Sequence, residues 1–143
     1  MEITRQADYA VRAVLEIAKL PDGRRASTSE IARQQGIPLT FLAKIVAQLA
    51  VSGIVHTTRG AHGGVTLARS PESISMLEVI EAIDGPITLN SCVTDGAYCV
   101  YSNDCPVRDV WCDVQAGLAD KLRSTTFAQL IGSQDGAGAR AAS

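Results

Sequence analysis

Residues 27–55, STSEIARQQGIPLTFLAKIVAQLAVSGIV, contain two helical patterns separated by a short turn. Ser27 and Glu30 form a capping box, which predicts the start of a helix, and Gly36 is a typical helix end. Apolar residues then return at helical spacing from Leu39 to Ser52. Two short helices joined by a glycine-containing turn are the arrangement of a helix-turn-helix.

The pattern changes from helical spacing to alternation directly after these two helices. The stretches 54–58 (IVHTT) and 65–68 (VTLA) are rich in β-branched residues, and the glycine-rich segment 59–64 (RGAHGG) separates them. This order predicts a β-hairpin, which forms a wing when it follows a helix-turn-helix. The wing is expected over 54–68, and the winged helix-turn-helix domain over 1–85.

Two further helices are predicted on either side of this region. The first extends from about Arg5 to Leu20, before the helix-stopping triplet at 21–23 (PDG). The second begins at a capping box whose first residue is Ser75, and this helix ends at Gly85. The fold class is therefore mainly α with a small β-hairpin.

A long helix is predicted from Pro106, because proline suits the first helical position. Apolar side chains recur along it every three or four residues, at Val107, Val110, Trp111, Val114, Leu118 and Leu122. A second copy of the same helix would cover this stripe. A symmetric homodimer is therefore predicted, with a dimerisation helix and a short terminal helix over 106–131.

The charges divide the chain into two parts. Its 143 residues carry a formal net charge of -2, and the length is that of one globular domain. Through Arg69 there are nine basic and five acidic residues, whereas the remainder has four basic and ten acidic residues. The basic front half suits a nucleic-acid partner, and the acidic back half suggests a second task.

The sequence predicts neither a membrane span nor a secretory signal. Its most apolar stretch, 41–55, is interrupted by Lys44, Gln48 and Gly53, whereas a span needs about 18 uninterrupted apolar residues. The first six residues, MEITRQ, are too polar for a signal peptide. A cytoplasmic protein without a membrane partner is expected, with a disordered low-complexity tail over 132–143.

The four cysteines lack the CxxC spacing of common zinc and redox sites. Cys92, Cys99 and Cys105 share the loop 86–105, which could bring three thiolates onto one iron–sulfur cluster. Ordinary buried thiols are the alternative, and structural disulfides are not expected in the cytosol. Cys112 would lie about 10.5 Å along the helix from Cys105, too far for both to bind one iron, so a packed or resolving thiol is predicted there.

The order of these parts resembles the bacterial winged-helix iron–sulfur transcription regulators, the IscR/NsrR-like family. The resemblance covers about residues 1–131. It rests on Tyr9-Ala10-Val11-Arg12, Ile31-Ala32, Gly36-Ile37-Pro38, Arg59-Gly60, Gly63-Gly64 and the three cysteines before the helix with Trp111. It implies a homodimeric repressor or activator that binds double-stranded promoter DNA and holds a 2Fe-2S or 4Fe-4S cluster.

The fourth cluster ligand is left open by this resemblance. IscR-like members have a histidine three residues after the last loop cysteine, where this chain has Arg108, whose guanidinium offers no free lone pair. Asp8 stands where an NsrR-like member supplies a carboxylate from the partner subunit. It equally suits an interaction with Arg12 or with the helix dipole. The predicted metal ligands are Cys92, Cys99, Cys105 and Asp8, with Cys112 as an alternative.

The DNA-contacting residues are predicted from the second helix of the helix-turn-helix and from the wing. The start of that helix would enter the major groove, and Arg59 would reach the minor groove. Thr28 lies at a helix N-terminus, where backbone amides attract phosphate, although capping alone accounts for this segment. The predicted contacts are Thr28, Pro38, Thr40, Phe41, Lys44, Arg59, Gly60 and His62.

The predicted function is a transcription regulator whose cluster senses iron–sulfur status, redox state or nitric oxide and modulates promoter affinity. The alternative is a cluster-free regulator of the same fold that depends on thiol oxidation or zinc. An enzyme is not expected, because no cysteine has a histidine nearby in the sequence and neither a phosphate loop nor a nucleophile elbow is present.

Overall fold

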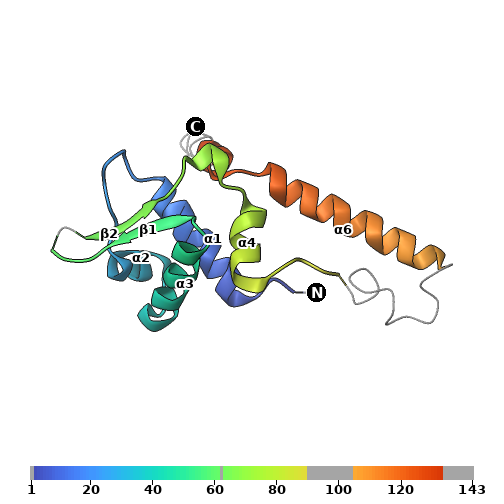
Figure 1. Cartoon of the computed structure of the whole chain (residues 1–143), viewed down its shortest axis with the longest axis horizontal. Coiled ribbons are helices and arrows are strands. Elements are labelled where there is room, and N and C mark those ends of the chain that lie inside the picture. The colour runs from blue at the N-terminus through green and yellow to red at the C-terminus, as the bar shows by residue number, and fades with distance from the viewer. Residues whose placement is uncertain (1, 62, 90–104, 134–143) are drawn as a thin grey trace, which may run out of the picture.

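A computed structural model describes residues 2–61, 63–89 and 105–133 of the chain. The elements are α1 (Arg5–Ala18), α2 (Thr28–Gln35), α3 (Leu39–Val51), β1 (Val55–Thr58), β2 (Gly64–Leu67), the short 3-10 helix η1 (Pro71–Ser73), α4 (Met76–Asp84) and α6 (Pro106–Ser124). A short helix over 127–133 follows α6. The predicted fold class, mainly α with a β-hairpin wing and a long C-terminal helix, is confirmed (Figure 1).

The helix-turn-helix forms where its capping residues predict it. The hydroxyl of Ser27 accepts a hydrogen bond from the amide of Glu30 at 3.1 Å and so caps α2. Gly36 ends α2 with φ +63°, a conformation that glycine adopts without strain. Pro38 occupies the position before α3 without a side-chain capping bond, and α3 begins at Leu39 as the sequence predicts.

The wing is an antiparallel hairpin in which Val55 pairs with Leu67 and Thr58 with Gly64. Its second strand also pairs with the chain before α2, because the Val65 amide donates to the Ala26 carbonyl at 2.8 Å. A Cβ at Gly64 would lie 2.8 Å from that carbonyl oxygen, so this close approach requires glycine. The start of the second strand is therefore held against the chain that leads into α2.

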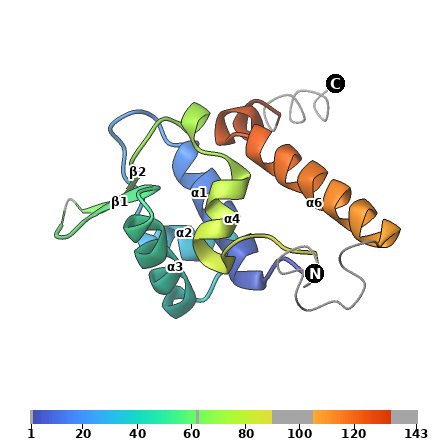
Figure 2. The ribbon, with the colours of Figure 1, turned by 45° about the vertical axis from the view of Figure 1, so that its right-hand side comes forward.

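One hydrophobic core joins the helices and the base of the wing. Helix α1 packs against both α3 and α4 in the middle of the body (Figure 2). The largest fully buried side chains are Phe127, Ile31, Leu42, Ile45, Leu49, Ile54, Ile74, Val14, Val55, Val65 and Val79.

Helix α6 leaves the body on the side opposite the wing (Figures 1 and 2). Two backbone hydrogen bonds hold its C-terminal end, from the amide of Met76 to the carbonyl of Thr125 (2.9 Å) and from the amide of Phe127 to the carbonyl of Ile74 (3.1 Å). The ring of Phe127 is completely buried among residues of the winged domain. The chain after α6 thus completes the core of the winged domain, which the sequence pattern does not predict.

Candidate functional site

The exposed face of α3 carries the residues predicted to contact the major groove. Pro38, Thr40, Phe41 and Lys44 are all exposed, and the Phe41 side chain is 46% exposed although it is aromatic. Leu42 and the other core residues of α3 point to the opposite side. The structure therefore places the four predicted residues on one accessible surface.

The same face continues along α3 with residues that the sequence analysis did not select. Ala47, Gln48 and Val51 are exposed. Gln48 follows Lys44 by four positions, so the two side chains lie on the same side of the helix. A glutamine amide can bind adenine through two hydrogen bonds. The helical spacing from Lys44 was the signal that could have revealed Gln48.

Arg59 and Gly60 lie at the exposed tip of the wing. The turn closes with a hydrogen bond from the Gly63 amide to the Gly60 carbonyl at 2.9 Å. A Cβ at Gly63 would overlap the carbonyl oxygen of Thr58, so glycine is needed for this tight turn. His62, the remaining predicted wing contact, lies outside the described residues.

Thr28 is the first residue of α2 and is only half-buried. Its neighbour Ser27 caps the helix through the amide of Glu30. The helix N-terminus therefore has its local capping interaction, and Thr28 is accessible beside it.

The cysteine site is described only in part. Cys105 is the residue that precedes α6, Cys112 lies within that helix, and both are free, partly exposed thiols. Cys92 and Cys99 lie outside the described residues. Within the ranges that the structure describes, no cluster of three or more histidine, cysteine, aspartate or glutamate side chains could hold a metal ion.

Asp8 forms an ion pair with Arg12 on the same helix, at 3.1 Å between the carboxylate oxygen and the guanidinium Nε. Both side chains are about half exposed. The interaction with Arg12 that the sequence analysis gave as one role of Asp8 is thus present.

The apolar stripe of α6 is exposed in the single chain. Val107, Val110, Trp111 and Val114 have exposed fractions between 40% and 58%. Four large apolar side chains on one helix form the kind of patch that a partner usually covers.

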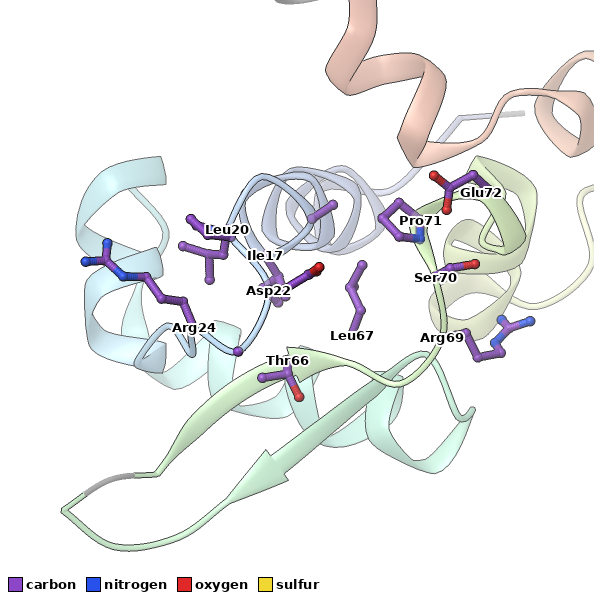
Figure 3. Close-up of a pocket in the computed structure, with 13 residues that line it drawn as sticks. Ile17, Leu20, Asp22, Arg24, Thr66, Leu67, Arg69, Ser70, Pro71 and Glu72 are labelled. Carbon is purple, nitrogen blue, oxygen red and sulfur yellow. The ribbon is translucent and has the colours of Figure 1, made fainter.

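A cavity of about 490 Å³ lies at the base of the wing (Figure 3). The end of α1, the following loop, β2 and the segment 69–72 surround it. Ile17, Leu20 and Leu67 contribute apolar walls, and Arg69 stands at its edge with its guanidinium turned away from the cavity (Figure 3). The cavity therefore lies between the end of α1, the base of the wing and the segment that leads from the wing towards α4.

These elements recur together in a known family. Residues 3–133 match the model of Rrf2, described as an iron-dependent transcriptional regulator. The chain belongs to the Rrf2 family. The predicted resemblance to IscR/NsrR-like regulators is confirmed at this level.

Two curated Rrf2 relatives cover nearly the whole chain. A protein of Mycobacterium tuberculosis strain H37Rv, named as a candidate HTH-type transcriptional regulator, is 33% identical over 132 residues, which are 92% of this chain and 82% of the relative. The HTH-type transcriptional regulator IscR of Escherichia coli K12 is 30% identical over 135 residues, which are 94% of this chain and 83% of IscR.

A solved structure confirms the fold. CymR, the global cysteine regulator of Bacillus subtilis, superposes with a TM-score of 0.81 at 25% identity and covers 93% of this chain and 98% of its own. The Rrf2 family and these relatives are DNA-binding transcription regulators and not enzymes. None of the helices in the described ranges is long and apolar enough to span a membrane.

Proposed function

We propose that this Rrf2 regulator binds promoter DNA as a cytoplasmic homodimer and that an iron–sulfur cluster in the loop 86–105 sets its affinity for DNA. The observation that carries the proposal is the position of Cys105. It stands immediately before α6, at the end of the cysteine loop and next to the exposed apolar stripe. A change in that loop would therefore act directly on the helix that we assign to the dimer.

The exposed stripe of α6 supports the homodimer. A second copy would pack its own Val110, Trp111 and Val114 against the same residues, which removes apolar surface from water in both copies. A two-fold axis through this contact relates the two winged domains. Two copies of α3 and of the wing would then bind two half-sites of a symmetric operator.

The chemistry of the donor set fits an iron–sulfur cluster. Cys92, Cys99 and Cys105 would supply three thiolates, which are the usual ligands of such clusters. Cys105 is partly exposed and unpaired, so its sulfur is accessible. We assign the fourth position to Asp8 of the partner subunit. When bound, the cluster supplies a centre that oxidants, nitric oxide or shortage of iron can alter.

Asp8 would have to leave Arg12 in order to bind iron. The ion pair is half exposed, and such pairs contribute only about 0–1 kcal/mol. Opening it is a small cost compared with the formation of a metal–ligand bond. The ion pair with Arg12 therefore does not prevent Asp8 from binding iron.

Within the family, IscR-like members often bind clusters whereas CymR-like members lack them. The three cysteines before α6 favour a bound cluster in this chain, as in the IscR-like members. A regulatory cluster must also change the affinity for DNA, because a group that leaves both conformations equally stable shifts no equilibrium.

The experiment begins with protein purified without oxygen. We expect a brown solution that contains iron and acid-labile sulfide. Holo and apo protein are then titrated onto one duplex that the protein itself has selected from random sequences. Different affinities support the proposal, and equal affinities overturn the switch. A colourless protein with stoichiometric zinc, or with no metal, overturns the cluster and supports the zinc or thiol regulator.

A further inference from the structure

We propose that Arg69 is a positioning residue that fixes the wing relative to α4 through Glu78. DNA affinity would then depend on this ion pair although neither side chain needs to contact DNA. The proposal rests on the proposed contact between the wing and DNA, and it adds a residue outside the predicted binding surface.

Arg69 connects three consecutive parts of the chain. It follows the end of β2 at Leu67 by two residues. Its guanidinium forms an ion pair with the carboxylate of Glu78 and also donates to the carbonyl of Ser73 at 3.5 Å. The Arg69 side chain points away from the neighbouring cavity (Figure 3).

Glu78 offers a fixed point for this contact. It lies in the first turn of α4, and its amide donates to the hydroxyl of Ser75 at 3.2 Å. A capped first turn holds the backbone that carries the carboxylate. Arg69 therefore ties the exit of the wing to a helix whose start is itself well defined.

The wing needs such a tie because two strands alone are only marginally stable. Near its tip, β2 is held by the pairing of Val65 with Ala26. At its base, the amide of Ala68 donates to the carbonyl of Ile54 at 2.9 Å. Arg69 adds a side-chain contact beyond the end of the strand and so limits rotation of the hairpin about its base.

The same segment also holds the end of α6. Ile74 and Met76 lie between Arg69 and Glu78 in the sequence, and they hydrogen bond to Phe127 and Thr125. The wing and the proposed dimer helix therefore meet at one short segment, 69–78. A contiguous path of this kind becomes a functional coupling only when the effect of mutations shows it.

The test measures the affinity of the full-length protein for its selected duplex, in one buffer at one salt concentration. We expect Arg69→Ala and Glu78→Ala each to weaken binding by about fivefold, which is the largest effect expected of a half-exposed ion pair. The double variant R69A/E78A should bind no more weakly than either single variant, because both remove the same contact. Arg69→Lys, which keeps the charge, should recover part of the loss.

Two variants serve as matched controls. Arg123→Ala removes an arginine from an exposed ion pair with Asp120 on α6. Glu81→Ala removes an exposed acid from α4, one turn from Glu78. We expect neither to change the affinity for DNA, whereas a general effect of charge would appear in both.

A direct contact between Arg69 and phosphate predicts a different result. In that case Arg69→Ala weakens binding, but Glu78→Ala leaves it unchanged or strengthens it because an acid is lost near DNA. Such a result overturns the positioning role. Denaturant unfolding curves of each variant check that it is folded under the binding conditions, so that a change in DNA affinity does not arise from unfolded protein.

A final comparison separates this proposal from the wing contact on which it rests. In an Arg59→Ala background the wing has lost its proposed contact, so Arg69→Ala should cause no further loss. An equal loss in both backgrounds overturns the positioning role. If Arg59→Ala alone has no effect, the wing contact itself is wrong and the positioning role fails with it.

Discussion

The carboxylate of Asp8 lies 3.1 Å from the guanidinium Nε of Arg12, one turn further along α1. The pair sits on the surface of the helix that packs against both α3 and α4. An exposed ion pair of this kind orients a carboxylate without burying it. The Asp8 carboxylate therefore stays accessible to solvent and to any partner that approaches this face of α1.

Replacement of Asp8 tests its assignment as a cluster ligand. We expect Asp8→Ala to change the visible absorbance spectrum of the anaerobic protein. We also expect it to accelerate iron release by at least about tenfold, because even residues that only support a ligand have effects of that size. Glu16→Ala, which removes the acid of the Lys19 ion pair on the same helix, is the control. An unchanged spectrum and release rate would remove Asp8 from the ligand set.

The two described cysteines should behave differently when each is replaced. Cys105→Ser is expected to lose iron and acid-labile sulfide, because a hydroxyl is a poor substitute for a thiolate ligand. Cys112→Ser is expected to keep both, because Cys112 lies inside α6 and away from the loop. Iron and sulfide analysis of the two proteins gives the answer. Equal retention in both would contradict the assignment of Cys105.

A charge placed in the α6 stripe should disrupt the homodimer. We expect Val114→Glu to shift the protein from dimer to monomer, because two unpaired carboxylates would be buried at the contact. Sedimentation velocity at micromolar concentration measures the change. Asp113→Ala alters the adjacent exposed position and should leave the dimer intact. A dimer of unchanged strength in Val114→Glu would place the contact elsewhere.

The wing contact has a signature in the salt dependence of binding. Loss of one phosphate or minor-groove cation lowers the slope of log affinity against log salt by about 1, so we expect this change for Arg59→Ala. Titrations at four or more salt concentrations measure the slope. Arg123→Ala, on the far helix α6, should keep the original slope. If the slope for Arg59→Ala equals that of the unchanged protein, this side chain does not contact DNA.

The buried ring of Phe127 should dominate the stability of the C-terminal connection. Phe127→Ala is expected to lower the free energy of unfolding by about 3–5 kcal/mol, because it leaves a cavity in the core. Denaturant unfolding of the purified protein measures this difference. Lys121→Ala, at an exposed position near the end of α6, should change it little. A loss near zero would mean that Phe127 is dispensable for the core.

Local signals account for most of the fold that the sequence predicts. Ser27, Ser75 and Pro106 begin α2, α4 and α6 where expected, because capping depends on residues within one turn. The first helix was expected to reach Leu20, whereas α1 ends at Ala18. Beyond that residue the amide of Leu20 donates to the carbonyl of Ile17, three residues back, which is the hydrogen bond of a 3-10 turn. The last turn of a helix is often of this 3-10 type, so a helix end predicted from a stop signal can differ from the observed end by one or two residues.

The exposed face of α3, which we propose binds DNA, was predictable for the same local reason. Helical spacing alone separates the exposed Thr40 and Lys44 from the buried Leu42 and Ile45 on α3. The burial of Phe127 and the ion pair between Arg69 and Glu78 were not predictable. Each joins elements that are brought together only by the tertiary structure, and no spacing in the sequence encodes their distance.

The position of Phe127 changes how truncated forms of the protein should be interpreted. A fragment that stops at Asp84 would retain every described residue of the proposed DNA contacts and would lack the aromatic ring of Phe127, which completes the core. A gene cut at this point would yield an unstable product. Loss of repression or activation in such a strain would then reflect degradation of the polypeptide, and would carry no information about signal perception.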